Sequence, residues 1–169
     1  MNQLLDSVIP PTPAELQQKL AVCLQLRQHD PALSNTNAYR LFNGFYEGFP
    51  SLTVDLFANT VLFTDHNRDA NPDREWYDSI ARFYMELLPN VRGVVLKRRH
   101  SRDSNLRNGQ LLLGDDISTS IIENGVNYAL DLQLNQDSSF YPDTRNLRLW
   151  LTAHMIGARV LNCFAYTGA

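Results

Sequence analysis

A largely apolar run close to the C-terminal end, Arg159-Val-Leu-Asn-Cys-Phe-Ala-Tyr-Thr-Gly168, constrains the fold more than any other segment. Continuous apolar strands are typical of sheets that are covered on both faces, as in α/β folds. A glycine directly after such a strand lets the backbone approach a ligand at the carboxyl end of the strand. The run therefore predicts a strand that begins near Arg159 and a ligand site at its end. A core strand followed by an ordinary turn explains the same pattern.

Composition excludes several classes of protein. Hydrophobic residues make up 44% and charged residues 20% of 169 residues, as in ordinary globular proteins. The N-terminus lacks the basic and apolar regions of a signal peptide, so a cytoplasmic protein is predicted, with no membrane contact. The net charge of −3 requires any nucleic-acid contact to come from a local patch. Cys23 and Cys163 have no metal-ligand spacing, so we expect two buried, reduced thiols and no metal.

Hydrophobic periodicity and turn signals predict a small α/β unit followed by the start of a second one. Thr12, Pro13 and Glu15 mark the start of a helix that reaches about Gln28. The remaining predicted elements are strands 39–43, 52–57, 61–66, 91–98 and 110–113, a helix opened by 71–72, a hairpin over 120–131 around Asn124-Gly125, and a helix from 142 that Gly157 caps. The predicted organisation is a helical segment (1–36), a small α/β domain (37–117) and a hairpin leading into the start of a second domain (118–169).

A basic cluster continues directly from the predicted strand 91–98. It contains Lys97, Arg98, Arg99 and His100, with Arg102 and Arg107 further along. A charge run of this kind is usually a solvated loop, but several cations together can also contact a phosphate backbone.

A glycine-rich loop, 44–50, carries aromatic residues that either fill a small core or stack on unpaired bases.

A second polar constellation, Gln136-Asp-Ser-Ser-Phe-Tyr-Pro-Asp-Thr-Arg145, lies just before the last predicted helix. It combines two carboxylates, two aromatic rings and an arginine. One interpretation is a helix-entry loop with Asp143 in the first turn, where the helix dipole favours a carboxylate. The other is a rim that holds a charged small molecule against the following strand.

The order of these motifs resembles the bacterial class I S-adenosylmethionine (SAM)-dependent ribosomal RNA methyltransferases, whose most similar members methylate C5 of cytosine. The resemblance runs from about residue 37 to the end. It is carried by Asn37-Ala-Tyr-Arg-Leu-Phe-Asn-Gly44, Gly48-Phe-Pro-Ser-Leu-Thr-Val-Asp55, Glu123-Asn-Gly125, the constellation above and Leu161-Asn-Cys-Phe-Ala-Tyr-Thr-Gly168.

The resemblance implies a small domain with a strand-strand-helix-strand-strand core, which helps to present RNA, followed by a Rossmann-like catalytic domain. It implies SAM as the cofactor and ribosomal RNA as the partner. The residues expected to contact SAM are Phe140, Asp143, Arg145, Asn162, Phe164, Ala165, Tyr166, Thr167 and Gly168. Lys97, Arg98, Arg99 and Arg102 are the candidates for RNA contacts.

Two stretches depart from the family pattern. Ser139-Phe-Tyr-Pro-Asp-Thr-Arg145 stands where the family usually has Gly-Phe-Phe-Leu-Asp-Gln-Arg, and Asp55-Leu-Phe-Ala58 where it has Asp-Arg-Tyr-Gly. The N-terminal PUA module that often precedes the small domain in this family is not seen. These departures bear on the predicted RNA target more than on the predicted cofactor.

The chain reads as the N-terminal part of such an enzyme, truncated just after the first methyltransferase motif. We therefore expect it to be inactive alone, with no catalytic residue of its own, and to pair with a second copy through exposed apolar surface near its C-terminal end. Three alternatives stay open: a non-catalytic RNA-binding or assembly module, methylation at a guanine nitrogen, and part of a dinucleotide oxidoreductase, whose GxGxxG fingerprint is missing.

Overall fold

A five-stranded sheet forms the centre of the computed structural model, which describes residues 10–68, 72–134, 137–161 and 163. The strands follow one another in chain order, and every neighbouring pair is antiparallel except β3 and β4. Helix α3 joins this parallel pair, because a parallel connection has to cross over the sheet. The strands are β1 (Ala38–Asn43), β2 (Leu52–Phe57), β3 (Thr60–Asp65), β4 (Gly93–Arg98) and β5 (Gln110–Gly114).

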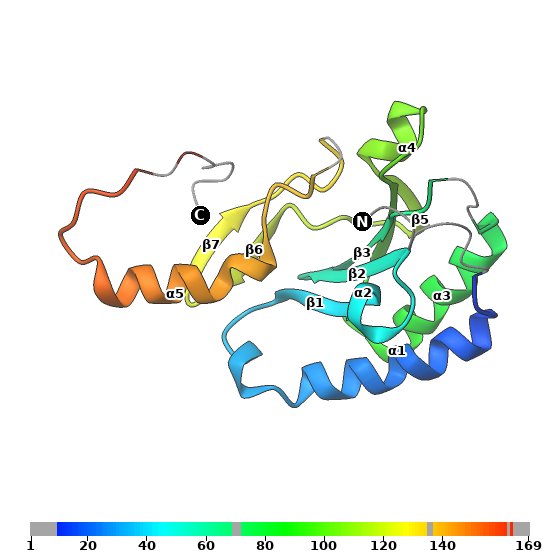
Figure 1. Cartoon of the computed structure of the whole chain (residues 1–169), viewed down its shortest axis with the longest axis horizontal. Coiled ribbons are helices and arrows are strands. Elements are labelled where there is room, and N and C mark those ends of the chain that lie inside the picture. The colour runs from blue at the N-terminus through cyan, green and yellow to red at the C-terminus, as the bar shows by residue number, and fades with distance from the viewer. Residues whose placement is uncertain (1–9, 69–71, 135–136, 162, 164–169) are drawn as a thin grey trace.

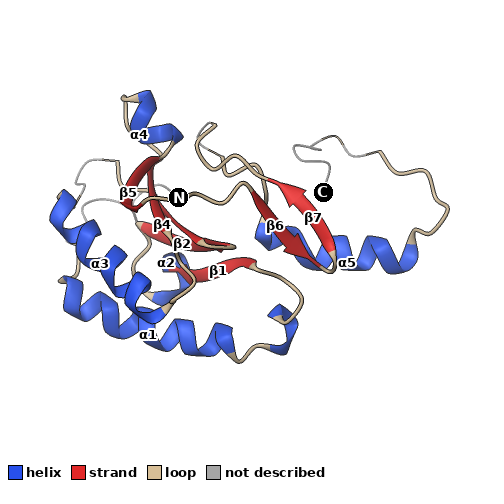
Figure 2. Ribbon diagram, turned by 180° about the vertical axis from the view of Figure 1, so that it is seen from behind, coloured by secondary structure: helices blue, strands red, loops and turns tan. Residues whose placement is uncertain are grey.

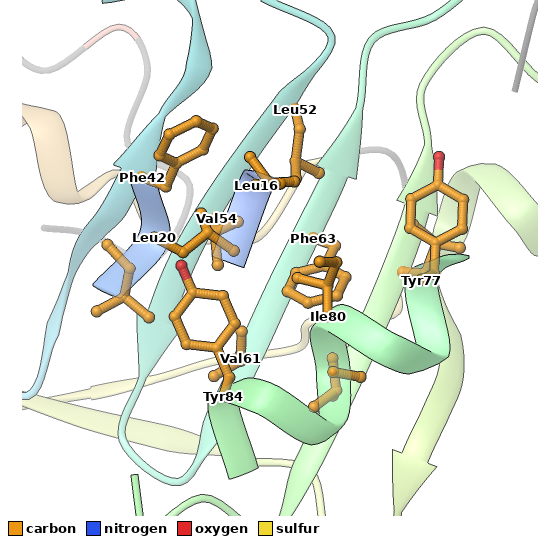
Figure 3. Close-up of a cluster of buried hydrophobic side chains, with 14 of the residues drawn as sticks. Leu16, Leu20, Phe42, Leu52, Val54, Val61, Phe63, Tyr77, Ile80 and Tyr84 are labelled. Atoms are coloured by element: carbon orange, nitrogen blue, oxygen red, sulfur yellow. The ribbon is translucent and has the colours of Figure 1, made fainter. Parts of the chain in front are cut away.

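Two helices, α1 (Pro13–Gln28) and α3 (Arg74–Leu87), cover one face of the sheet (Figure 1). Thr12 and Glu15 form the predicted capping box at the start of α1. Leu16 and Leu20 of α1 are fully buried together with Ile80 and Tyr84 of α3. Figure 3 shows these side chains gathered against Phe42, Val54 and Phe63 of the strands. Helix α1 therefore shares one hydrophobic core with the sheet.

The other face of the sheet is partly covered by a hairpin made of β6 (Ser120–Glu123) and β7 (Val126–Ala129) and by the segment that follows it. Asn124 and Gly125 both have positive φ values, 51° and 80°, as a type I′ turn requires. Helix α5 (Arg145–His154), preceded by the single turn η2 (Pro142–Thr144), lies beside this hairpin (Figure 2). A second, smaller core joins Phe57 and Val95 of the sheet to Ile121 and Phe140.

Most predicted elements are confirmed, with shifts at their ends. Helix α3 begins at Arg74 because Asp73, rather than the preceding Asn-Pro pair, caps it by accepting the Trp76 N–H at 2.9 Å. Strand β4 begins at Gly93. Three short helical turns lie in segments predicted as loops: η1 (Pro31–Leu33), α2 (Gly44–Glu47) and α4 (Ser104–Asn108).

The strand predicted to begin near Arg159 does not form over residues 159–161, and the rest of that prediction, 162 and 164–168, lies outside the described residues. A strand needs a partner for its backbone N–H and C=O groups, and residues 159–161 have none within the described chain.

Cys163 is exposed rather than buried as predicted, whereas Cys23 is buried, which raises the pKa of its thiol to about 11.

Exposed apolar side chains gather on and after α5. Leu147 and Trp150 are 56% and 52% exposed, and Ile156 and Leu161 are nearly fully exposed. This confirms the predicted apolar surface near the C-terminal end. Within the described residues, no helix is both long and apolar enough to span a membrane.

Candidate functional site

A cavity of about 240 Å³ lies on the sheet face opposite α1 and α3. Strand register brings polar residues of three strands together there, because Thr53 of β2 pairs with Thr64 of β3, which pairs with Lys97 of β4. The cavity is lined by Arg40, Phe45, Thr53, Asp55, Leu62, Thr64, His66, Lys97, Arg99, Asp137, Ser138, Phe140, Tyr141, Pro142 and Asp143.

Arg40 of β1 and Asp55 of β2 form a bidentate salt bridge. They stand directly opposite each other in the ladder, and the Arg40 Nε and Nη2 atoms donate to the two Asp55 carboxylate oxygens at 2.9 and 3.1 Å. Burial raises the pKa of Asp55, the Arg40 guanidinium opposes this shift, and the nearby Asp143 carboxylate adds to it. This pair fixes one acidic and one basic group at the cavity wall.

Lys97 is buried at the floor of the cavity. Its Nζ donates to the Asp137 carbonyl oxygen at 2.5 Å, and this hydrogen bond connects β4 to the segment 137–143, which lines the cavity. Burial lowers the pKa of Lys97 to about 8, and Asp137 and Asp131 act in the opposite direction. Lys97 is therefore easier to deprotonate than a surface lysine.

His66 and Phe45 form an aromatic corner at the end of β3. The rings meet edge to face with their centroids 5.3 Å apart, and the His66 Nε2 lies 3.3 Å from the Thr53 hydroxyl. Burial, together with the cations Arg99 and Arg40 and with His100, lowers the pKa of His66 to about 4. His66 is therefore neutral at physiological pH.

The segment 137–143 forms the remaining wall, and the β6–β7 hairpin and α5 hold it in place. The Arg148 guanidinium lies over the Phe140 ring at 4.3 Å and donates to the Tyr141 carbonyl at 3.1 Å. The same guanidinium binds Glu123 at the end of β6 with distances of 2.6 and 2.9 Å. One arginine thus connects the hairpin, α5 and the cavity wall.

The predicted basic cluster does not act as one patch. Successive residues of a strand point to opposite faces, so Lys97 and Arg99 line the cavity, whereas Arg98 packs on the helical side. The Arg98 guanidinium lies 5.4 Å from the centre of the Tyr77 ring and donates to the Pro72 carbonyl. Arg102 is exposed in the loop before α4.

The expected cofactor residues in 140–145 are close together but differ in access. Asp143 is exposed at the cavity mouth, and among the described residues its carboxylate makes no hydrogen bond or ion pair. Phe140 is 1% and Arg145 is 8% exposed, so in this arrangement both support the wall from within. Asn162, Phe164, Ala165, Tyr166, Thr167 and Gly168 lie outside the described residues.

Sequence reasoning assigned no role to several residues that line this cavity. Thr53 and Asp55 alternate with apolar residues along β2, whereas Thr64 and His66 flank Asp65 at the end of β3. Such alternation in a strand that is buried on both faces signals a polar site rather than a solvated surface. Within the described part of the chain, no cluster of three or more His, Cys, Asp or Glu side chains is arranged to hold a metal ion.

Comparison with known proteins bears on this arrangement. Residues 45–169 match the family described as S-adenosylmethionine-dependent methyltransferase, a span that includes most of the cavity. The chain belongs to this family. Ribosomal RNA large subunit methyltransferase I from Yersinia pseudotuberculosis and from Yersinia pestis is 33% identical over 137 residues, covering 79% of this chain and 34% of the relative.

Solved methyltransferase structures share the fold. One, from Streptococcus mutans and assigned as a SAM-dependent methyltransferase, superimposes with a TM-score of 0.66 over 86% of this chain and 37% of its own, at 24% identity. Another, SMU.776, was solved in complex with SAH and gives a TM-score of 0.69 over 86% of this chain and 36% of its own, also at 24% identity. The chain spans about a third of the length of the curated relatives it matches.

The described residues fit part of a site for SAM. Asp143 is an exposed carboxylate of the kind that would bind the ammonium group of the methionine portion. The Arg145 Nε is a buried polar atom with no hydrogen bond within the described chain, and it lies 3.9 Å from the Glu123 carboxylate, so Arg145 holds this wall from behind. When bound, SAM would supply an electrophilic methyl group.

Proposed function

We propose that the protein carrying this chain is a SAM-dependent methyltransferase that acts on ribosomal RNA, at C5 of a cytosine. The match of residues 45–169 to the methyltransferase family carries the proposal. The relatives named ribosomal RNA large subunit methyltransferase I support ribosomal RNA as the substrate. The cytosine assignment rests on the resemblance of the motifs alone.

The proposed roles of the residues follow from their access. Asp143 contacts SAM, and Phe140 and Arg145 hold the segment that carries it. The predicted contacts at 162 and 164–168 remain predictions from the motif. Lys97, Arg98, Arg99 and Arg102 are proposed for RNA, with Arg99 and Arg102 offering exposed cations and the buried Lys97 and half-buried Arg98 supporting the strand that presents them.

Deletion of the gene in its own organism tests this function on the intact protein. Nucleoside mass spectrometry and bisulfite sequencing of large-subunit ribosomal RNA should show the loss of one 5-methylcytidine, restored when the gene is returned. Loss of a methylguanosine instead would move the target to a guanine nitrogen. Unchanged RNA methylation would contradict the proposed activity and favour a non-catalytic RNA-binding or assembly module.

Two further predictions concern location and assembly. A cytoplasmic location follows if ribosomal RNA is the substrate. Pairing of two chains is supported by the exposed Leu147, Trp150 and Ile156 on and after α5. Analytical ultracentrifugation of the wild-type chain and of a Trp150→Glu variant tests this pairing, since the charge should shift a dimer towards a monomer.

A further inference from the structure

The single turn η2 carries Asp143, the carboxylate proposed for the ammonium group of SAM. We propose that Arg148 of α5 is a positioning residue for the cofactor: it fixes both ends of this turn, so that Asp143 is in place before SAM binds. Arg148 does not line the cavity, so it acts through the turn and not by contact with the cofactor. The inference rests on the proposed function and assigns to the site a residue that the motifs did not indicate.

Arg148 contacts the residues on both sides of Asp143. Its Nη1 atom donates to the Tyr141 carbonyl oxygen at 3.1 Å and to the Thr144 hydroxyl oxygen at 2.6 Å. The Thr144 hydroxyl in turn donates to the same Tyr141 carbonyl at 2.9 Å. These three hydrogen bonds close the turn around Asp143, and the ring of Pro142 restricts the backbone at its start. The backbone at Asp143 is therefore fixed by contacts that leave its side chain exposed.

Thr144 serves the turn instead of the helix that follows it. It stands at the N-cap of α5, where a threonine hydroxyl commonly accepts a backbone N–H of the first helical turn. Within the described chain the Thr144 side chain makes no such capping bond. Its hydroxyl is held between Arg148 and the Tyr141 carbonyl. The contact therefore contributes to the geometry of the turn and not to the end of the helix.

Arg148 can hold the turn because its own guanidinium is held in place. Glu123 at the end of β6 binds it through both carboxylate oxygens, and the Phe140 ring lies against it. The two side chains of this salt bridge are only 11% and 1% exposed. A planar guanidinium bound in this bidentate way has one preferred orientation. The turn is thus attached to a helix and a strand, which position a binding group more precisely than a loop does.

The charges around Asp143 do not fix its position by themselves. Asp55 repels the Asp143 carboxylate, and Arg40 attracts it. These two neighbours form a salt bridge with each other, so their opposite effects on Asp143 largely cancel. The contacts of Arg148 with the backbone and with Thr144 therefore decide where the carboxylate lies.

A turn that is fixed in advance increases the affinity for the cofactor. A ligand that has to order a segment of the protein loses part of its binding free energy to that ordering. With Arg148 in place, the ammonium group of SAM meets a carboxylate that is already in position. Without it, binding of SAM would have to order the turn as well.

Isothermal titration calorimetry of the intact protein that carries this chain tests the inference. The probe is SAH, which keeps the amino-acid part of SAM, and the comparison ligand is 5′-methylthioadenosine, which lacks that part. Thr144→Val removes one hydroxyl from the turn and leaves the salt bridge of Arg148 intact. Arg148→Lys keeps the positive charge but cannot hold the carboxylate and both turn contacts together. Each variant should weaken SAH about tenfold and leave the affinity for 5′-methylthioadenosine unchanged, because only the amino-acid part depends on Asp143.

Thr152→Val is the matched control. It also removes a hydroxyl from an exposed threonine beside Arg148, but this hydroxyl donates to the Arg148 carbonyl at 2.9 Å and not to the turn. The affinity for SAH should therefore not change. Thermal unfolding of each variant identifies any loss of binding that comes from misfolding.

A double-mutant cycle with Asp143→Asn tests whether Arg148 acts through Asp143. Asp143→Asn alone should weaken SAH, because a neutral amide binds an ammonium group less strongly than a carboxylate does. In this background, Thr144→Val should cause little further loss, since the turn no longer carries the charge that it positions.

The outcomes separate this inference from the proposed function. If the wild-type protein does not bind SAH, both are wrong. If it does, the positioning role alone is overturned by any of three results: Thr144→Val and Arg148→Lys bind SAH as the wild type does, Thr144→Val weakens both ligands equally, or its loss adds fully to that of Asp143→Asn. If Asp143→Asn binds SAH as tightly as the wild type, the proposed role of Asp143 is wrong, and the role of Arg148 is wrong with it.

Discussion

Arg148 of α5 and Glu123 at the end of β6 form a bidentate salt bridge with N–O distances of 2.6 and 2.9 Å, which joins the C-terminal helix to the hairpin. The Glu123 side chain is 1% exposed, and the Arg145 Nε lies 3.9 Å from the same carboxylate. One buried carboxylate therefore balances two largely buried guanidinium groups. The position of the cavity wall depends on this balance, because Arg148 also covers Phe140 and binds the Tyr141 carbonyl.

Glu123→Gln should lower the free energy of unfolding by about 3 kcal/mol, because it leaves two buried positive charges without a carboxylate. Urea unfolding followed by circular dichroism measures the loss, and hydrogen exchange should show that α5 amides lose protection first. Asp78→Asn is the control, since its partner Arg74 is 58% exposed, and should change stability by less than about 1 kcal/mol. Equal losses in the two variants would contradict the role assigned to Glu123.

Helix α1 should contribute strongly to the stability of the sheet. Leu20→Ala removes a side chain that is 0% exposed in the main core and should cost about 2–5 kcal/mol in urea unfolding. Leu26→Ala on the same helix removes the same atoms from a residue that is 61% exposed, and should stay within about 0.5 kcal/mol. A small loss for Leu20→Ala would instead support the predicted boundary between residues 36 and 37.

Local signals predicted the elements that depend on neighbouring residues. The capping box of Thr12 and Glu15 and the Asn124-Gly125 turn are decided within a few residues, so both were predicted correctly. The prediction of a strand at 159–161 was wrong, because an apolar run forms a strand only when another strand pairs with it. Local sequence specifies the tendency to form a strand, whereas the presence of a pairing strand decides whether the strand forms.

The candidate site depended on register, which local patterns specify poorly. Arg40 stands opposite Asp55 only because the pairing of β1 with β2 shifts between Arg40 and Phe42. The alternation of side chains along β4 was available from the sequence, and it separates Lys97 and Arg99 from Arg98. Treating these residues as one basic cluster missed that separation.

The buried Lys97 should make the stability of the fold rise with pH in the alkaline range. Its pKa is lowered to about 8 in the folded state from an ordinary value of 10.5, so between these values the unfolded chain binds more protons than the folded one. Raising the pH through this window therefore favours folding through this residue. In Lys97→Met this contribution should be absent, which the difference between wild-type and variant urea midpoints at pH 7.5 and 10 would show. Lys19→Met, which removes the other, exposed lysine, is the control.

His66 should also make the stability of the fold rise with pH, in a lower, acidic window. Its pKa is about 4 in the folded state, below the ordinary value of 6.5, because burial and the cations Arg99 and Arg40 disfavour the imidazolium. Between pH 6.5 and 4 the unfolded state binds the extra proton, so stability is lost as the pH falls through this window. Allowing for the partial exposure of the ring, the loss is on the order of 1 kcal/mol. Titration of the His66 ring by two-dimensional NMR should give a midpoint well below the ordinary value of 6.5, and His66→Gln should flatten the dependence of the urea midpoint on pH between 6.5 and 4. A ring that titrates near 6.5 would show that His66 is solvated, and the neutral aromatic corner with Phe45 would then be wrong.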